Sequence, residues 1–318
     1  MSGMFRVSVR LASLCPLLQN AKGNETPMVN NLRNILFLVL LLLTATPALA
    51  QRTSKRVPAD LVRKPFVPAD PTTFPGETER LDVFLLIGQS NMKGRGVMPK
   101  QPLEDARIVM LHKRTDEWFH ARHPLHHVGD PRTFENSDNA GVGPGLAFAQ
   151  ALVAKDPKLR IALIPCAVGG TQIAKWQKGQ RLYRDAVRRA KLALEQGPNG
   201  KTRIAGALWL QGEADSSTAE KIERYPKLLS GMIKDLRADL ELPELPFIAC
   251  TIGELRDDSK EARASINRVL LELPDRVAHT ACVDSRSFAV DIGDRVHFDT
   301  ATQEEHGRRF AAKYLELK

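Results

Sequence analysis

The 318-residue sequence has few cysteines and no long apolar run. It holds 4 cysteines, none of them in a CxxC or CxxH pair, which argues against a Cys-based zinc site. Cys166, Cys250 and Cys282 each lie in an apolar stretch, which is typical of small buried hydrophobic residues rather than of a disulfide framework. The longest apolar run, residues 35–43, is well short of the roughly 20 residues that a membrane-spanning helix needs.

Positive charge is in excess, but the sequence has no block of basic residues. The 46 lysines and arginines against 37 aspartates and glutamates give a net charge of +9. Residues 1–50 contain 4 basic residues and 1 acidic residue, and the remaining excess is interspersed with acidic residues. A nucleic-acid partner would need a basic patch or stripe. The charge pattern therefore argues against nucleic acid, and the 43% hydrophobic content predicts a folded globular chain.

The N-terminal segment has the pattern of an export signal. The apolar run 35–43 follows Arg33 and is followed by Pro47 and a small-residue stretch that ends at Ala50. This order matches the basic region, apolar region and cleavage site of a secretory signal. A buried core helix, the alternative, would have polar residues at helical spacing.

A start at Met28 would give this signal a basic region of normal length. We therefore predict a start-site artefact over residues 1–27 and a signal peptide over residues 28–50, cleaved near Ala50. No cysteine stands beside the cleavage site, so a lipid anchor is not expected. The mature chain is expected to be secreted or periplasmic, with no membrane anchor after signal removal.

The rest of the chain divides into a proline-rich segment and one α/β domain. Residues 51–80 contain five prolines among charged residues, which predicts a linker or a strap over the surface. From residue 81 onward, continuous apolar runs alternate with helical patterns, as in a parallel sheet covered on both faces. We expect a single doubly wound three-layer α/β/α domain over residues 81–318, with a mostly parallel five-stranded sheet. The predicted strands are residues 81–87, 106–111, 160–165, 204–210 and 246–252, with a weaker run at 277–283.

Helices are predicted between and after these runs. Residues 225–240 carry one apolar stripe at helical spacing, and residues 266–273 carry another. A last helix is predicted over residues 301–317, because Thr300 and Gln303 stand at the spacing of a capping box.

Two glycine-containing segments stand where predicted strands end, which is where α/β sheets bind ligands. Residues 88–92, GQSNM, place Ser90 between a buried strand and a helix. There its hydroxyl would be exposed and close to backbone N–H groups, as a nucleophile needs, although Ser90 could equally cap the helix. Residues 166–171, CAVGGT, could present N–H groups to an anion or form a simple tight turn.

Two polar segments stand at later positions. Residues 209–215, WLQGEAD, follow the fourth strand, and the Gln211 amide is a neutral donor that could stabilise an oxyanion or cap a helix. Residues 294–299, DRVHFD, place Asp294 three residues before His297. Such a pair gives a catalytic triad in the chain order Ser, Asp, His, although a lone DxxH is also common in ordinary loops.

Together, GQSNM, VGGT, WLQGEAD and DRVHF resemble the SGNH hydrolase superfamily, which has a flavodoxin-like fold. Within it they resemble the carbohydrate acetylesterases of esterase family six and the sialate O-acetylesterases. The resemblance runs from residue 81 to the C-terminus and includes GVGPGLAFA at residues 141–149. It implies Ser90 as nucleophile, His297 as general base and then acid, and Asp294 as the orienting carboxylate.

The resemblance also implies an oxyanion hole and an activity. The oxyanion donors would be the backbone N–H groups of Ser90 and Gly170 and the Gln211 side chain, where the wider superfamily carries Asn. The implied protein is a secreted serine esterase that removes O-acetyl groups from carbohydrates of the acetylxylan or sialate type, with no metal or organic cofactor. The alternatives are a short-chain aryl or lipid esterase on the same triad and a catalytically silent carbohydrate-binding protein.

Five residues near these segments are candidates for substrate contact. They are Gln89, Asn91, Glu213, Trp176 and His126. Trp176 could stack on a sugar ring, whereas Trp209 is expected in the core because it lies in a predicted strand. For Glu213 a structural role is favoured, since a carboxylate near an oxyanion opposes catalysis. His126 belongs to a histidine-rich stretch, residues 112–127, whose irregular spacing and loop character argue against a metal site.

Overall fold

The computed structural model describes residues 64–73, 80–101, 104–134 and 139–318, apart from the side chain of Asp257. These residues all belong to one unit, Thr53–Lys318. The predictions for residues 1–27 and 28–50, and for most of residues 51–80, lie outside the described residues. Within the described part, no helix combines the length and the apolar character that crossing a membrane requires.

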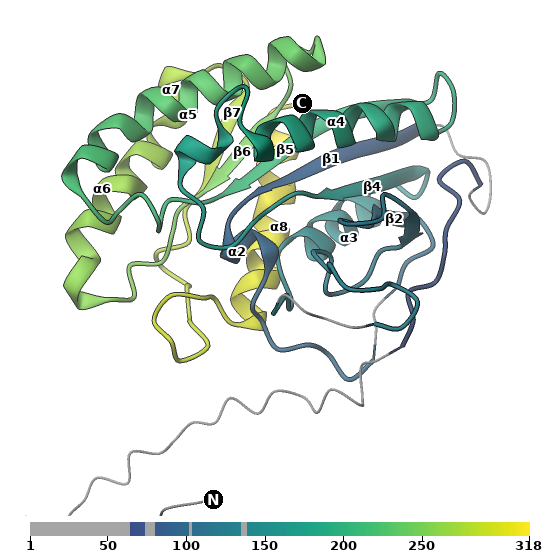
Figure 1. Cartoon of the computed structure of the whole chain (residues 1–318), viewed down its shortest axis with the longest axis horizontal. Coiled ribbons are helices and arrows are strands. Elements are labelled where there is room, and N and C mark those ends of the chain that lie inside the picture. Colours follow the sequence, from purple (N-terminus) through teal and green to yellow (C-terminus); the bar gives the residue numbers. More distant parts are fainter. Residues whose placement is uncertain (1–63, 74–79, 102–103, 135–138) are drawn as a thin grey trace, which may run out of the picture. The chain divides into compact units, whose positions relative to one another are not determined.

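A seven-stranded sheet forms the middle layer of this unit (Figure 1). Its strands are Arg80–Gly88 (β1), Ile108–Leu111 (β2), Trp118–His120 (β3), Leu159–Pro165 (β4), Thr202–Leu210 (β5), Phe247–Cys250 (β6) and Thr280–Val283 (β7). Their order is β3-β2-β4-β1-β5-β6-β7, and all neighbours are parallel except β2 and β3. Because β1 lies between β4 and β5, the loops that follow those two strands flank its C-terminal end.

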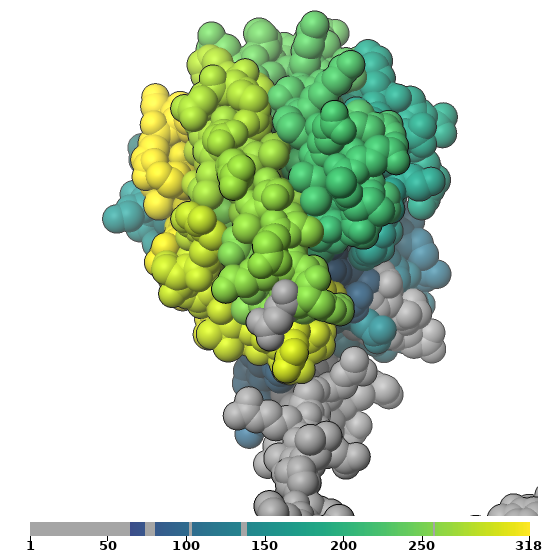
Figure 2. Space-filling view, turned by 90° about the vertical axis from the view of Figure 1, so that its left-hand side faces the viewer, coloured from purple at the N-terminus to yellow at the C-terminus, as the bar shows by residue number. Residues whose placement is uncertain are grey.

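Helices cover both faces of the sheet (Figure 1). Gly145–Lys155 (α3) and Thr300–Glu316 (α8) pack on one face, and Arg181–Gln196 (α4), Ala219–Leu240 (α5) and Lys260–Leu271 (α6) pack on the other. Figure 2 shows α5 in green and α6 in yellow-green on the outer surface of that layer. The short helices are Ser90–Lys93 (α2), Ile173–Trp176 (η2), Asp257–Ser259 (η3) and Leu273–Arg276 (α7).

The side chains of β1 show why both faces must be covered. Its buried residues alternate between two apolar clusters: Val83 and Leu85 face the layer with α4, α5 and α6, whereas Phe84 and Leu86 face the layer with α3 and α8. Successive side chains of a strand point to opposite faces, so an unbroken apolar run requires cover on both. The chain therefore has the doubly wound three-layer α/β/α architecture that the sequence predicts.

Details of the sheet differ from the prediction. The five predicted strands and the weaker sixth run are present, but β3 adds an antiparallel edge strand that the sequence did not indicate. It has three residues, too few to show a periodic pattern. In addition, β4 lies between β2 and β1. The order of the parallel strands thus differs from the 2-1-3-4-5 order typical of flavodoxin-like sheets.

The start of α8 also differs from the prediction. Its N-cap residue is Asp299, whose side chain accepts a hydrogen bond from the Thr302 N–H at 2.8 Å. The capping box predicted from Thr300 and Gln303 is therefore wrong, because the preceding aspartate takes the capping position. Instead, the Gln303 amide donates to the Asn91 carbonyl at 3.0 Å.

Residues 64–73 lie along the edge of the sheet beside β3. The Ala69 N–H donates to the Trp118 carbonyl, and the His120 N–H donates to the Val67 carbonyl, each at 3.0 Å. Phe66 is buried, with its ring centroid 5.9 Å from that of Phe119. This part of the proline-rich segment therefore straps the edge strand and contributes a side chain to the core.

Candidate active site

The turn after β1 is shaped by Gly88. Its φ is +133°, and a Cβ atom added there would lie 2.3 Å from the Leu210 carbonyl oxygen. Only glycine fits such a backbone and such an approach. The chain can therefore leave the sheet beside β5 and enter α2 at once, with Ser90 as its first residue.

Ser90 follows this turn directly and is 4% exposed. The sequence predicted an exposed hydroxyl there, but the neighbouring loops leave little of the residue open. The N-cap position of α2 is Gln89 and not Ser90. The Ser90 hydroxyl makes a different contact, with a histidine 207 positions later in the chain.

Ser90, His297 and Asp294 form a hydrogen-bonded chain. The Ser90 Oγ is 3.0 Å from His297 Nε2, and His297 Nδ1 is 2.5 Å from Asp294 Oδ2. Asp294 Oδ1 accepts hydrogen bonds from the N–H groups of His297 and Val296. Burial opposes ionisation of Asp294, but the hydrogen bonds from these groups outweigh it and lower the pKa of Asp294. This arrangement suits transfer of the Ser90 proton to an imidazole whose other nitrogen is held by a carboxylate.

The loop that carries His297 is closed by its own side chains. Asp291 accepts hydrogen bonds from the N–H groups of Gly293 and Arg295, at 2.5 and 3.0 Å. The Ile292 N–H donates to the His297 carbonyl at 2.9 Å. Asp291 was not among the predicted site residues, although its spacing to Gly293 is that of an Asx turn.

The glycine pair after β4 lies against Ser90. A Cβ atom added to Gly169 would be 3.8 Å from the Ser90 Cβ and 3.5 Å from Arg95 Nη2. Gly170 has a φ of +69° and is exposed, with open space where a side chain would stand. The structure therefore brings the predicted anion-binding loop beside the serine.

Gln211 is fully buried behind this loop. Its Nε2 donates to Asp215 Oδ2 at 2.6 Å and to the Thr171 carbonyl at 3.0 Å, and its Oε1 accepts from the Tyr225 hydroxyl at 3.0 Å. Burial raises the pKa of Asp215, which also accepts from the Ile173 N–H. Both N–H groups of the amide thus have acceptors inside the protein, which conflicts with its predicted use as a direct oxyanion donor. Tyr225, whose hydroxyl holds the Gln211 side chain, was not among the predicted site residues.

Three predicted substrate contacts are Gln89 and Asn91, which flank Ser90 in the chain, and Glu213, which bonds to Asn91. Gln89 and Asn91 are buried. The Asn91 amide donates to Glu213 Oε1 at 2.5 Å, and Glu213 Oε2 is buried as well. Burial raises the pKa of Glu213. Asn91 and Glu213 thus bond to each other inside the site, which conflicts with their predicted contacts with substrate and agrees with the structural role favoured for Glu213. Gln89 is about as buried as Ser90 itself, so its substrate contact stays a prediction.

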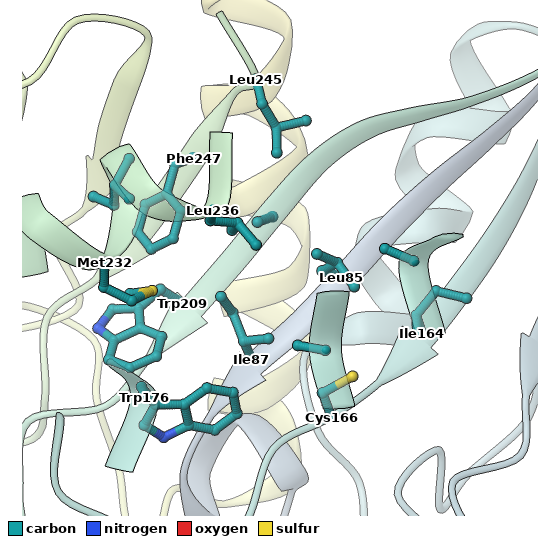
Figure 3. Close-up of a cluster of buried hydrophobic side chains, with 14 of the residues drawn as sticks. Leu85, Ile87, Ile164, Cys166, Trp176, Trp209, Met232, Leu236, Leu245 and Phe247 are labelled. Carbon is teal, nitrogen blue, oxygen red and sulfur yellow. The ribbon is translucent and has the colours of Figure 1, made fainter. Parts of the chain in front are cut away.

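Trp176 does not offer a surface to a sugar. It is 1% exposed, and its ring meets that of Trp209 edge to face at a centroid distance of 5.6 Å (Figure 3). The stacking prediction is therefore wrong, because the rings pack together under α5. The prediction that Trp209 belongs to the core is confirmed.

His126 is 1% exposed, so the predicted substrate contact is wrong here too. Burial lowers its pKa well below the ordinary value. The histidine-rich stretch contributes to the interior: His112 Nε2 lies 3.0 Å from His127 Nδ1, and the His127 ring lies 5.1 Å from that of Phe66. Burial and the nearby cations Lys113 and Arg189 both favour the neutral form of these imidazoles.

A comparison with protein-family models places the chain in a family of esterases. The model described as carbohydrate esterase, sialic acid-specific acetylesterase matches residues 80–316. The chain belongs to this family. It is therefore a carboxylic ester hydrolase of the carbohydrate acetylesterase class, and the match covers the strands, the serine turn and the histidine loop.

Relatives from a plant and a bacterium agree with this membership. A probable carbohydrate esterase of Arabidopsis thaliana, At4g34215, is 31% identical over 253 residues, which are 73% of this chain and 90% of that protein. Its crystal structure has a TM-score of 0.62, with 74% of this chain and 98% of that chain covered. A probable 9-O-acetyl-N-acetylneuraminic acid deacetylase of Escherichia coli K12 is 29% identical over 119 residues, 31% of this chain and 36% of that protein. The crystal structure of NanS shares the fold, with a TM-score of 0.63 at 19% identity and with 76% and 98% of the two chains covered.

Proposed function

We propose that this esterase removes O-acetyl groups from carbohydrates by way of an acetyl-enzyme on Ser90. The observation that carries the proposal is the 3.0 Å contact between Ser90 Oγ and His297 Nε2, with Asp294 on the other side of the ring. A nucleophile, a base and an orienting carboxylate in this order are the parts that serine acyl transfer requires.

In the first half of the reaction, the Ser90 Oγ attacks the ester carbonyl carbon while its proton passes to His297 Nε2. The carbonyl oxygen becomes an oxyanion, which the N–H groups of Ser90 and Gly170 would hold. His297 then gives the proton to the sugar oxygen as the ester C–O bond breaks, and the acetyl group remains on Ser90. A water molecule repeats these steps and releases acetate.

Gln211 has an indirect part in this proposal. It holds the Thr171 carbonyl and the Asp215 carboxylate, and Asp215 in turn holds the N–H of Ile173. These contacts fix the loop that carries Gly170 beside Ser90. The Gln211 amide therefore places the backbone donors that would meet the oxyanion, instead of meeting it directly.

Sialic acids and xylan are the acetylated substrates that we propose to test. The family description and the name of the E. coli relative support the former. The experiment measures acetate release from O-acetylated sialic acid and from acetylated xylan with the wild-type protein, Ser90→Ala and Ser217→Ala. Ser217 is an exposed serine whose hydroxyl donates to the Ala214 carbonyl, so its variant is the matched control.

We expect Ser90→Ala to lower kcat by about 10⁶-fold and Ser217→Ala to leave it unchanged. Circular dichroism should show the same folded content in all three proteins. A Ser90→Ala protein that keeps more than about a hundredth of the activity would contradict the acetyl-enzyme mechanism.

Export of the chain is a second part of the proposal. Its support is the sequence pattern of residues 28–50. Expression of the full chain in a bacterial host, followed by N-terminal sequencing of the periplasmic and secreted fractions, should yield a chain that begins near Gln51. Protein found only in the cytoplasm with residues 28–50 attached would contradict export.

A further inference from the structure

Asn91 follows Ser90 directly, is 0% exposed, and reaches both neighbours of His297 with one amide group. Its Nδ2 donates to the Val296 carbonyl at 3.1 Å, and its Oδ1 accepts from the Phe298 N–H at 3.1 Å. These contacts span more than 200 positions of the chain. The side chain thus holds the backbone on both sides of the histidine.

Two further bonds fix Asn91 itself. Its Nδ2 lies 2.5 Å from Glu213 Oε1, and its backbone carbonyl accepts from the Gln303 amide at 3.0 Å. Because Glu213 Oε1 accepts from Nδ2, it favours the amide orientation in which Oδ1 faces the Phe298 N–H. Phe298 and Gln303 are fully buried, so water cannot replace these bonds when they are lost.

The two aspartates beside His297 act differently from Asn91. Asp294 and Asp291 belong to the same loop as His297, so they shape the loop and orient the ring. They do not tie that loop to the turn after β1. Asn91 does, and its Cα is one peptide unit, about 3.8 Å, from that of Ser90.

We infer that Asn91 is a positioning residue that sets the distance between the Ser90 hydroxyl and the His297 ring, with Glu213 orienting its amide. This inference rests on the proposed function, because it assumes that Ser90 and His297 are the reacting pair. It assigns Asn91 to neither the substrate nor the oxyanion. Loss of the contact would displace His297 and slow attack by Ser90 without weakening substrate binding.

The test measures the rate constant at which Ser90 reacts with a 4-nitrophenyl phosphonate, followed by release of 4-nitrophenol. The phosphonate reports on the serine and its base, whatever ester the enzyme uses. The proteins are the wild type, Asn91→Ala, His297→Ala and the double variant. A misplacement of about 1 Å can cost about 10²-fold, so we expect Asn91→Ala to slow the reaction by about that factor.

The double variant decides how Asn91 acts. If Asn91 acts through His297, adding Asn91→Ala to the His297→Ala protein should change the rate constant by less than about twofold. The reason is that the effects of substitutions in groups that act as a unit are not additive. An equal slowing in both backgrounds would overturn the inference. The inference would also be overturned if Asn91→Ala reduced the fraction of protein whose Ser90 reacts with the phosphonate but left the rate constant of the reactive fraction unchanged. That result would mean that Asn91 only stabilises the fold.

Asn267 provides a matched control. It is also fully buried, and its amide contacts the N–H and carbonyl of Ile252 at 2.7 and 2.9 Å and Glu254 Oε1 at 2.8 Å. Asn267→Ala should lower the unfolding temperature as Asn91→Ala does. Its rate constant per Ser90 site should stay within about twofold of the wild-type value.

A pair of substitutions that exchanges the carboxylate and the amide between Asn91 and Glu213 tests the role of Glu213. The same pair tests the inference if Asn91→Ala fails to fold. Asn91→Asp places a second carboxylate against Glu213 and removes the donor to Val296. Adding Glu213→Gln returns a donor to the pair, so the rate constant should recover by at least about tenfold. No recovery would overturn the orienting role of Glu213.

These outcomes separate the inference from the proposed function. A wild-type protein that reacts with phosphonate at Ser90 but releases no acetate from any acetylated sugar would refute the function and leave the test of Asn91 intact. A wild-type Ser90 that reacts no faster than Ser90 in His297→Ala would overturn the positioning role.

Discussion

Single residues at the site carry constraints that their neighbours do not share. Gly88 is the clearest case, because its positive φ and its contact with the Leu210 carbonyl both exclude a side chain. Asp294 is another, since its two oxygens hold both the backbone and the ring of His297. The motif around each residue could be recognised in the sequence, but the atom that each one meets could not.

Replacing Gly88 should therefore be costly. Gly88→Ala forces the backbone away from a positive φ and from the Leu210 carbonyl, which should lower the free energy of unfolding by roughly 2–4 kcal/mol. Gly231 is the control: it lies in α5 with open space around a Cβ atom, so Gly231→Ala should raise stability by roughly 0.5–1 kcal/mol. Urea unfolding measures both, and equal effects of the two substitutions would refute the steric explanation.

Among the secondary-structure elements, long ones were predictable and short ones were not. β1 and β5 have 9 residues each and α5 has 22, so their apolar patterns are clear. β3 has three residues and depends on pairing with β2 and with residues 67–69. The beginning of α8 was misplaced by one residue, because Asp299 and Thr300 are both good capping residues and only their surroundings choose between them.

Residues 64–73, which lie along the edge of the sheet beside β3, should contribute strongly to stability through one side chain. Phe66 is buried among aromatic rings and lies 4.4 Å from the Arg122 guanidinium, so Phe66→Ala should cost about 3–5 kcal/mol of unfolding free energy. Val67, the next residue, is 46% exposed, and Val67→Ala should change stability by less than about 0.5 kcal/mol. Thermal unfolding compares the two, and a Phe66→Ala protein as stable as Val67→Ala would show that the strap is not part of the core.

At the scale of the whole unit, the chain buries histidines that must stay neutral. Burial, with smaller contributions from His127 and Arg189, lowers the pKa of His112 to about 4, and burial lowers that of His306 to about 3. The unfolded chain binds protons at these histidines near pH 6.5, so it takes up protons that the folded protein does not. The free energy of unfolding that the neutral histidines contribute is complete above about pH 6.5. It is lost as the pH falls toward about 4 for His112 and about 3 for His306.

We expect His112→Gln to make stability less sensitive to acid. A pKa difference of this size is worth roughly 3 kcal/mol, so the loss of unfolding free energy between pH 7 and pH 4 should be smaller in the variant by up to that amount. Glu213 and Asp215, whose pKa values are raised by burial, act in the opposite direction. The measurement is therefore the difference in unfolding free energy between pH 7 and pH 4 for each protein. His279 is exposed, and His279→Gln is the control. If His112→Gln left the pH dependence of stability unchanged, the buried His112 would not be a source of acid sensitivity.

The sequence by itself determined the layers of the fold and the four segments of the site, because apolar periodicity and glycine turns are local properties of the chain. It also indicated Ser90, His297 and Asp294, whose types and order are those of serine esterases. Only the tertiary structure decided what the neighbouring polar and aromatic residues do. Asn91, Gln211 and Trp176 could each have faced a substrate, but the elements packed against them turn all three inward. Burial depends on what lies opposite a residue in space, and no local pattern contains that information.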